Sequence, residues 1–486
     1  MLDSLITIAY LVAAALFIFG LKRLSSPRTA RGGNRMASVG MLIAVAAALF
    51  ERQILNPAEL IAGLALGGAV GLLLARKIKM TSMPELVAAF NGFGGAASAL
   101  VAAAEVMRLA GAEQIARLSD GEQVIASALS PTLALTIALS VLIGSVTFSG
   151  SFVAFAKLNG RLKSMGFPGL RIISILVGLG IVGAAALMVE QAPSFPLQAS
   201  MMTTALFALA GLALVLGIFL VLPIGGADMP VVVALLNSYS GLAAAATGFV
   251  LQNYALIVSG ALVGASGLIL TKIMCEAMNR SLLNVLLGGF GAEAKKATTK
   301  SGDEEDRPVR QTSPDDVAVL MSYAGSVIIV PGYGLAVAQA QHEVREMADL
   351  LQEEGVEVRY AIHPVAGRMP GHMNVLLAEA NVSYDLLIEM DDINADFPST
   401  DVVLVVGAND VVNPAAHNDE SSPIYGMPIL NVDEAENIIV LKRTMNTGYA
   451  GVQNELFFNP KTSMLFGDAK DSVGAIISEL KELAAA

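Results

Sequence analysis

A glycine-rich turn follows a short apolar run in the C-terminal third of this 486-residue chain. The run Val327–Val330 predicts a buried strand, and Pro331-Gly-Tyr-Gly334 predicts a tight turn into a helix expected over Leu335–Glu353. Glycines in such a turn let the backbone approach a phosphate closely, and the start of a helix attracts an anion. Val337 replaces the third glycine of the usual dinucleotide fingerprint, so an ordinary tight turn stays open as the alternative.

Two adjacent cations, Lys442 and Arg443, directly follow another apolar run, Ile438–Leu441. Paired cations suit the 2′-phosphate that distinguishes NADP(H) from NAD(H). The acidic residue that would hold a free ribose 2′-hydroxyl has no clear counterpart at the predicted second strand, Val356–Ile362. The pattern therefore favours NADP(H), with a merely solvated Lys-Arg pair as the alternative.

Asp410 ends the sequence Gly407-Ala-Asn-Asp, which follows the predicted strand Asp401–Val406. Ligands bind outside the carboxyl ends of the strands in parallel sheets. Asp410 is therefore expected beside a bound ligand.

Two asparagines stand inside long apolar segments. Asn91 falls about two helical turns after Pro84, and Asn237 about two turns after Pro230, so both are expected at membrane depth. An amide donates and accepts at once, which suits it to hold a water chain or to bond an ionisable partner. The alternative is a hydrogen bond that only joins two helices. No acid or base occurs near the middle of a segment, so a proton route needs a carboxylate at a segment end or a group from another chain.

The elements that must position these residues are of two kinds. The chain is 55% hydrophobic and only 15% charged, against roughly 25% charged residues in an ordinary soluble domain. Its N-terminal part holds apolar blocks long enough to cross a bilayer, which takes about 20 residues per helix. Nine blocks qualify, of which the second is short and is expected to extend into polar flanks: Ser4–Leu21, Ala37–Phe50, Ala58–Ala75, Pro84–Met107, Ala134–Phe155, Ile172–Val189, Met202–Leu222, Pro230–Leu251 and Ala255–Cys275.

Positive charges orient these blocks. The loops after blocks one, three and five carry most of the Lys and Arg residues, whereas the loops after blocks six and eight carry none. Positive loops stay in the cytoplasm, so the N-terminus is expected outside and the C-terminal part inside. The first block has no basic start and no cleavage site, which predicts a retained anchor. Glycines such as Gly63, Gly67 and Gly178 are expected to let the helices pack closely.

From Asp303 onward, strands and helices alternate, ending in a helix expected over Asp468–Leu483. This order predicts an α/β, Rossmann-like, doubly wound parallel sheet. The stretch Gly288–Ser313 has no apolar period and predicts a linker. The expected organisation is therefore a transmembrane domain at 1–287, a linker at 288–313 and a soluble domain at 314–486.

Composition also excludes several classes of function. The net charge of −12 argues against a nucleic-acid partner. The single cysteine, Cys275, cannot form an internal disulfide, and the four histidines and this cysteine form no pattern typical of a metal site.

Several motifs, in order along the chain, resemble the β subunit of proton-translocating NAD(P) transhydrogenase, and the likeness covers nearly the whole chain. The matching stretches are Val330-Pro-Gly-Tyr-Gly-Leu-Ala-Val-Ala-Gln-Ala340, His363-Pro-Val-Ala-Gly-Arg-Met-Pro-Gly-His372, Gly407-Ala-Asn-Asp410, Lys442-Arg-Thr-Met-Asn-Thr-Gly-Tyr-Ala-Gly451 and Asp228-Met-Pro-Val-Val-Val-Ala-Leu-Leu-Asn-Ser-Tyr-Ser-Gly241. The resemblance implies that a hydride passes from NADH to NADP⁺ while protons cross the membrane. It places NADP(H) on this chain and NAD(H) on another.

The resemblance also implies residue roles. Asp410 links protonation to nucleotide state, Lys442 and Arg443 hold the 2′-phosphate, and the segment 446–449 forms a lid over the nucleotide. The implied proton path comprises Asn91, Asn237, Ser238 and Asp228. The implied cofactor-binding positions are Gly332, Tyr333, Gly334, Val337, Ala366, Gly367, Arg368, Met369, Pro370, Gly371, Gly407, Ala408, Asn409, Asp410, Val411, Gly426, Met427, Lys442, Arg443, Asn446, Thr447, Gly448, Tyr449, Asp468 and Ala469.

Position 91 departs from the family pattern, because several relatives carry histidine where this chain has Asn91. A titrating group from the partner subunit is the expected substitute. The implied partners are an α subunit with an NAD(H) domain and further transmembrane helices, membrane lipid, and a second copy of the complete assembly. The implied location is a bacterial inner membrane. The rival interpretation is a channel or transporter whose soluble domain only senses a nucleotide; it predicts NADP binding without NADH-dependent reduction.

Overall fold

A computed structural model describes residues 2–24, 26–50, 57–78, 82–118, 129–166, 169–192, 199–225, 228–279, 281–288, 309–369, 371–448 and 450–485. The chain divides into two compact units, which are described separately: Met1–Thr271 with Leu286–Phe290, and Lys272–Val285 with Gly291–Ala486. Most of the predicted linker, residues 289–308, lies outside the described residues. The domain boundaries at 287/288 and 313/314 therefore stay predictions.

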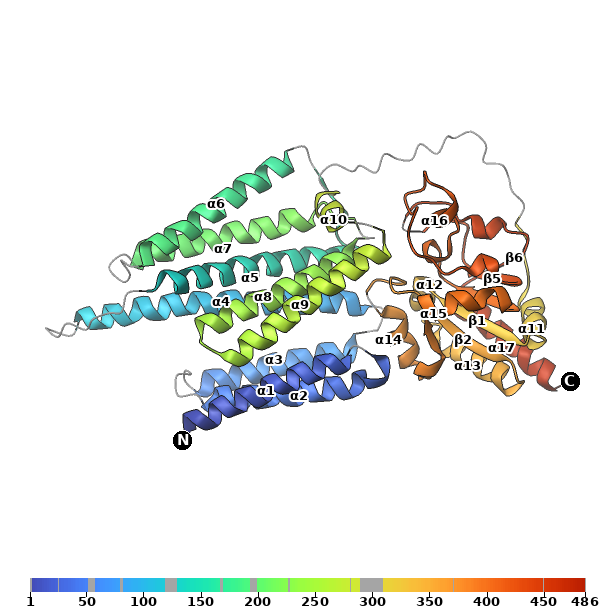
Figure 1. The fold of residues 1–486 in the computed structure, drawn as a ribbon, viewed down its shortest axis with the longest axis horizontal. Coiled ribbons are helices and arrows are strands. Elements are labelled where there is room, and N and C mark those ends of the chain that lie inside the picture. Colours follow the sequence, from blue (N-terminus) through green and yellow to red (C-terminus); the bar gives the residue numbers. More distant parts are fainter. Residues whose placement is uncertain are drawn as a thin grey trace. The chain divides into compact units, whose positions relative to one another are not determined.

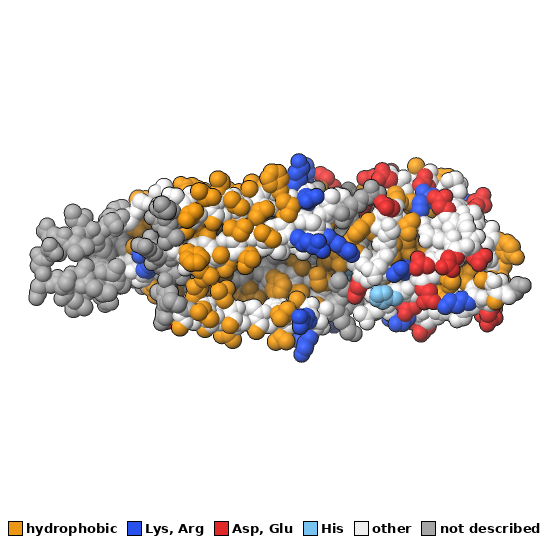
Figure 2. Space-filling model, turned by 90° about the horizontal axis from the view of Figure 1, so that it is seen from below, with side chains coloured by type: hydrophobic (Ala, Val, Ile, Leu, Met, Phe, Trp, Pro, Cys, Tyr) orange, Lys and Arg blue, Asp and Glu red, His pale blue; other side chains and the backbone are white. Residues whose placement is uncertain are grey.

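The N-terminal part is built of long apolar helices (Figure 1). Nine described helices are long and apolar enough to span a membrane, which confirms the predicted count. The second helix begins in its polar flank at Pro27, as expected from its short apolar block. Figure 2 shows hydrophobic side chains over most of the visible face of these helices, and Lys and Arg at one end of them. The helices are α1 (Leu2–Leu24), α2 (Pro27–Phe50), α3 (Pro57–Lys77), α4 (Met83–Leu118), α5 (Pro131–Leu158), α6 (Leu170–Gln191), α7 (Ala199–Val221), α8 (Met229–Val250) and α9 (Tyr254–Ala277).

Glycines bring pairs of these helices into backbone contact, α4 with α5 and α8 with α9 among them. A Cβ added to Gly95 of α4 would lie 2.7 Å from the carbonyl oxygen of Gly144 in α5. A Cβ on Gly241 of α8 would lie 2.5 Å from Gly264 N in α9. Around Gly63, Gly67 and Gly178, by contrast, a Cβ would meet nothing within 4 Å among the described residues. For these three glycines the expected role in helix packing stays a prediction.

The second unit contains a six-stranded parallel sheet in the order β3-β2-β1-β4-β5-β6, which confirms the predicted Rossmann-like fold. Central strands such as β4 are buried on both faces and consist of Val and Leu, the residues that pack best in a covered parallel sheet. The strands are β1 (Ser326–Pro331), β2 (Glu357–Ile362), β3 (Leu387–Glu389), β4 (Val402–Val406), β5 (Asn437–Lys442) and β6 (Thr462–Phe466).

Helices cover the sheet and connect its strands (Figure 1). They are α11 (Pro314–Ser322), α12 (Tyr333–Ala338), α13 (Gln341–Glu353), α14 (His372–Glu379), α15 (Met390–Ile393), α16 (Ala415–Asn418) and α17 (Ala469–Ala485). The short helix α10 (Leu282–Gly288) follows α9 in the chain and is not one of them. Short 3₁₀ turns are η3 (Tyr384–Leu386), η4 (Asn394–Ser399), η5 (Asp410–Val412), η6 (Val432–Glu434) and η7 (Glu455–Phe458).

The helix predicted over Leu335–Glu353 is in fact two helices. Gln339 adopts a left-handed conformation with φ of 54° and ends α12 after six residues. The chain restarts as α13 at Gln341. The expected anion attraction therefore rests on the first turn of the six-residue α12 and not on one long helix.

Candidate functional site

The carboxyl ends of β1 and β4 meet where the strand order reverses direction, which is where sheets of this kind form a crevice. Gly332 N donates to Val406 O, and Gly334 N donates to Gly407 O, each at 2.9 Å. A Cβ on Gly332 would lie 2.4 Å from Ala408 N, and one on Gly407 would lie 2.4 Å from Gly334 Cα. The predicted glycines and Ala408 thus form one junction in which two backbones touch. Only glycine fits at 332, 334 and 407.

This junction leaves few N–H groups of the turn for a ligand. Gly332 N and Gly334 N bond the β4 side, and Leu335 N donates to Gly332 O at 3.1 Å. The glycines therefore serve first to seat β1 against β4. Val337 lies further along α12 and is 44% exposed, so it takes no part in the junction.

The loop after β2 forms one wall beside Tyr333. The Arg368 guanidinium lies over the Tyr333 ring, 4.4 Å from its centroid, and the His372 ring lies 6.3 Å from the same centroid. Arg368 N donates to His372 Nδ1 at 3.0 Å. Burial, and to a smaller extent the charge of Arg368, lower the pKa of His372 to about 4. His372 is therefore neutral, and Arg368 carries the positive charge of this wall.

Glycine conformation shapes the same loop. Gly367 and Gly371 have positive φ of 106° and 67°, and Ala366 is buried. Met369 O accepts from His372 N at 3.2 Å, which turns the chain into α14. Pro370 lies outside the described residues.

His363, which no predicted role included, ties this loop to the segment 426–428. Its Nε2 donates to Pro428 O at 2.9 Å, and its Nδ1 accepts from Val365 N at 3.2 Å. Burial lowers the pKa of His363 to about 4, so the ring is neutral. Gly426 has φ of 77°, and Met427 packs in the same hydrophobic cluster as Ala415. The two predicted positions 426 and 427 thus lie in the segment that His363 joins to the loop after β2.

Asp410 begins η5 and lies under the predicted lid. Its Oδ2 accepts from Ala450 N at 3.0 Å. A Cβ on Gly448 would lie 2.3 Å from Asp410 Oδ1, so only glycine lets the lid approach this carboxylate. Tyr449 lies outside the described residues. The structure therefore brings Asp410 and Gly448 together.

The two adjacent cations point to different partners. Lys442 Nζ donates to Asn446 O and lies 4.6 Å from the centroid of the Phe457 ring. Burial lowers the pKa of Lys442 to about 8, against the opposing charge of Asp410. Arg443, which is more exposed, pairs with Asp468 at 3.0 Å. Lys442 thus faces the lid and Asp410, whereas Arg443 faces the start of α17, where Ala469 is buried.

Three asparagines join the Asp410 turn to the chain that leaves the lid. With its amide oxygen toward the lid, Asn409 accepts from Gly448 N at 2.8 Å and from Lys442 Nζ at 3.1 Å. Asn454 Nδ2 donates to Asn409 O at 3.0 Å, and Asn413 Nδ2 donates to Gln453 O at 3.1 Å. Asn413 and Asn454 were not predicted; their position among apolar residues was the available signal. Val411 packs against the hydrophobic core beside them, and Thr447 lies within the lid.

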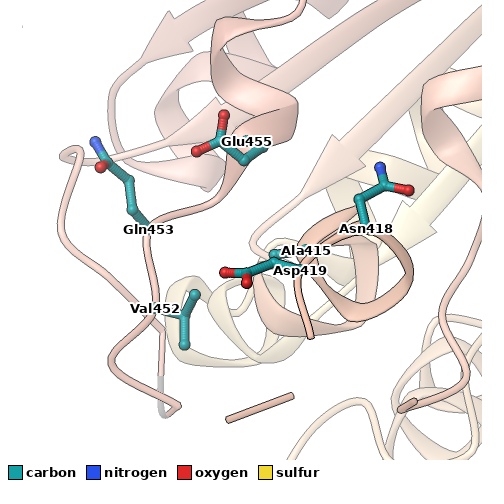
Figure 3. A pocket seen from close by; sticks show the side chains of 6 residues that line it. All are labelled: Ala415, Asn418, Asp419, Val452, Gln453 and Glu455. Carbon is teal, nitrogen blue, oxygen red and sulfur yellow. The ribbon is translucent and has the colours of Figure 1, made fainter. Parts of the chain in front are cut away.

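A hollow lies beside this support (Figure 3). It lies between α16 and the segment Val452–Glu455, and Asp419 and Glu455 contribute carboxylates to its lining. None of the predicted cofactor-binding residues lines it. Within the described ranges, no group of three or more His, Cys, Asp or Glu side chains is arranged to hold a metal ion.

The predicted proton-path residues lie on α8 and α4. Asn91 is buried, and its Nδ2 donates to Val233 O at 3.4 Å, one turn before Asn237. Asn237 is half-buried on α8. Ser238 turns the other way, because its Oγ donates to Gly264 O of α9 at 2.6 Å. Asp228 lies at the helix start as the N-cap residue of α8. The structure therefore brings Asn91 close to the Asn237 turn and places Ser238 against α9.

A family model and two relatives agree on the family that this chain is similar to. The model of the family described as NAD(P) transhydrogenase beta subunit matches residues 6–479. Two proteins of Rhodospirillum rubrum, both named NAD(P) transhydrogenase subunit beta and one of them from a specified strain, are 50% identical to this chain over 482 residues. The match covers 99% of this chain and 100% of each relative.

Proposed function

The chain belongs to the family of NAD(P) transhydrogenase beta subunits, and from that premise we propose that it binds NADP(H) at the β1/β4 crevice and couples hydride transfer from NADH to proton movement across the membrane. Membership of the family makes the chain a subunit of an oxidoreductase. The bound nucleotide supplies the hydride chemistry. The residues of this chain bind it, orient it and exclude water from it.

The observation that carries this proposal is the junction of Gly332, Gly334 and Gly407 at the point where the sheet order reverses, flanked by two arginines. Arg368 lies on the Tyr333 side, and Arg443 lies toward α17. Phosphate groups fit guanidinium donors well. The crevice beside this close junction of β1 and β4, with a guanidinium group on either side, fits a dinucleotide.

Arg443 is the proposed partner of the 2′-phosphate. It is half-exposed and held by a single carboxylate, Asp468, which a phosphate can replace. Lys442 instead acts from beneath the lid, through Asn446 O and Asn409. In this proposal Arg443 recognises the ligand, and Lys442 holds the lid that covers it.

Asp410 is the proposed coupling acid. Its ionised form accepts from Ala450 N and faces Lys442, so ionisation favours the lid in the position seen here. Protonation weakens both interactions and favours a looser lid. By thermodynamic reciprocity, a proton that changes nucleotide affinity is itself bound more or less tightly according to the nucleotide state.

In the membrane, Asn91 and Asn237 are the proposed hydrogen-bonding sites of the proton route, with Ser238 and Asp228 flanking them on α8. Neither amide titrates. The titrating group is therefore either a carboxylate at a helix end, such as the buried Glu85 of α4, or a side chain of the partner. The α subunit is the proposed partner, carrying NAD(H) and further transmembrane helices, because the described residues contain one dinucleotide-type sheet. We propose a dimer of complete assemblies in lipid of a bacterial inner membrane, with the C-terminal unit in the cytoplasm.

The test uses the complete complex in sealed vesicles with a pH-sensitive dye. NADH should reduce NADP⁺ only when the partner subunit is present, and proton movement should accompany it. The chain itself should bind NADP(H) strongly and NAD(H) poorly, with Arg443→Ala reducing that preference about tenfold, the loss of one charge-assisted contact. Comparable affinities for both nucleotides would refute the assignment. NADP(H) binding without any NADH-dependent reduction would support a sensor-equipped transporter instead.

A further inference from the structure

A group of hydroxyls joins three membrane-spanning helices at a place that no sequence motif indicated. The side-chain oxygens of Ser140 in α5 and Thr247 in α8 lie 2.7 Å apart. Both hydroxyls also lie 3.3 Å from the backbone oxygen of Ser98 in α4. All three residues are buried, with Ser140 at 0% and Thr247 at 3% exposure. These three residues are the hydroxyl cluster.

Only one of the two bonded hydroxyls is accommodated in the usual way for a helix: Thr247 Oγ1 donates to Ala243 O of its own helix at 2.9 Å. The oxygens around Ser140 Oγ, which are Thr247 Oγ1, Ser98 O and Ala243 O at 2.7, 3.3 and 3.4 Å, all lie on other helices. Thr136 of α5 shows the usual way, because its Oγ1 donates to Thr132 O of its own helix at 2.7 Å. In the cluster, one hydroxyl donates to the other and the second donates to a carbonyl, since each carries a single hydrogen. Each oxygen still has a lone pair to offer. The pair can therefore donate and accept across helices.

The cluster lies on the same seam as the proposed proton route. Asn91 and Ser98 are seven residues apart on α4, so they share one face and stand about 10 Å apart along it. Ser240 and Thr247 share a face of α8 in the same way. A Cβ on Gly94 would lie 2.8 Å from Ser240 Oγ, which places Ser240 against α4 between the two ends.

Three contacts fix the order along this seam. Asn91 contacts α8 at Val233, Gly94 faces Ser240, and Ser98 contacts Thr247. Later positions of α4 meet later positions of α8, so the two helices run parallel. Polar groups therefore follow one another from the Asn91 level, through Ser240, to the hydroxyl cluster.

We propose that the hydroxyl cluster is a second station of the proton route, beyond Asn91 and Asn237. This inference rests on the proposed function. A hydroxyl that takes a proton from a water molecule on one side releases its own proton to a water molecule on the other side, so the step balances and leaves no charge behind. The cluster thus needs no titrating side chain, which suits a bundle whose asparagine at position 91 cannot titrate.

The test compares variants of the complete complex, purified with its partner subunit and sealed in vesicles with a pH-sensitive dye. Thr247→Val keeps the shape of the side chain and removes its hydroxyl. The double variant Thr247→Val with Ser140→Ala, called the emptied variant, has no hydroxyl at either position. We expect coupled hydride transfer and proton movement to fall together by about tenfold or more, the loss of at least one essential hydrogen bond. Thr247→Ser, which keeps a hydroxyl at position 247, should retain most of the wild-type rate of coupled hydride transfer. The solvent deuterium isotope effect should rise in the emptied variant.

Thr136→Val is the matched control, because it removes a hydroxyl from α5 that bonds only its own helix. It should leave rate and isotope effect unchanged. Normal proton movement per assembled complex in the emptied variant, with only a lower melting temperature, would show a helix contact and overturn the proposal. Asn237→Leu is measured alongside. If that variant also pumps normally, the route itself is wrong; if it stalls while the emptied variant pumps, only the hydroxyl cluster is removed from it.

Discussion

Asparagines of the sheet-containing unit and asparagines of the membrane helices are used in opposite ways. Asn413 and Asn454 are buried, and each uses both ends of its amide: Asn413 Oδ1 accepts from Ala415 N at 3.1 Å, and Asn454 Oδ1 accepts from Leu456 N at 2.9 Å. Among the described residues, the Asn91 side chain makes one hydrogen bond, at 3.4 Å. The Asn237 side chain makes none within the same ranges. A saturated amide fixes a backbone, whereas an amide with spare donors and acceptors has capacity left for water or a partner.

From this contrast we expect that replacing Asn413 or Asn454 lowers stability, whereas replacing Asn91 or Asn237 lowers the proposed coupling. Asp410 stands between them, since its partners are the lid backbone and a lysine rather than a saturated network. Four substitutions break or sharpen the contrast.

Asp410→Asn should have the largest effect. The amide keeps the size of the side chain but loses the charge that faces Lys442 and accepts from Ala450 N. A charge-assisted hydrogen bond contributes roughly 1.5–3 kcal/mol, so coupled turnover should fall by about ten- to hundredfold. Unfolding of the sheet-containing unit should change far less. A coupled rate equal to that of the wild type, with the same pH dependence, would remove Asp410 from the mechanism.

Asn237→Leu comes next, in the membrane. Removing a hydrogen-bonding site without adding charge should lower proton pumping and the reverse hydride transfer by about tenfold, because the proposed function couples the two processes. NADP(H) affinity of the separate segment from about Asp303 onward cannot change, since its sequence is identical. Pumping and hydride transfer are measured on one purified preparation. Normal pumping by correctly assembled enzyme would leave Asn237 as a helix contact only.

Asn413→Ala should show the opposite pattern. Two backbone partners, Gln453 O and Ala415 N, lose a buried amide, so the free energy of unfolding should fall by about 2 kcal/mol. Hydride transfer at saturating nucleotide should stay within about twofold, since one lost support still leaves Asn409 and Asn454 in place. Denaturant titration and turnover on the same variant check this. A large loss of rate without a loss of stability would contradict the contrast.

His363→Gln should have the smallest effect, and only in acid. Burial holds the folded pKa of His363 at about 4 against its ordinary value of 6.5. The unfolded chain therefore takes up a proton first, so the stability associated with neutral His363 is complete above pH 6.5 and is lost as the pH falls toward 4. Between pH 6.5 and 5.5 the loss is about 1 kcal/mol. The variant should remove this part of the slope, leaving that of His372, which has the same direction of shift. An unchanged slope would show that His363 is accessible to protons in the folded state.

The sequence alone determined the two kinds of element and most of the central sheet. Runs such as Val402–Val406 are apolar on both faces and too short for a helix, so they indicate buried parallel strands. Nine apolar blocks of bilayer length determined the membrane helices in the same way. Strands β3 and β6 were not predicted, because Leu387–Glu389 and Thr462–Phe466 carry polar residues. Their stability as strands depends on pairing with the neighbouring strands.

Only the tertiary structure decided which side chains of a motif share a partner. Lys442 and Arg443 are neighbours in sequence, yet one faces Asp410 and the other Asp468. Gln339 broke a helix that its sequence favoured, and Ser140, Thr247 and Ser98 came together from three helices over 107 and 149 residues of chain. Local sequence patterns report which backbone a segment prefers. Partners, by contrast, depend on long-range packing, because a side chain's direction is fixed only when neighbouring elements fill the space around it.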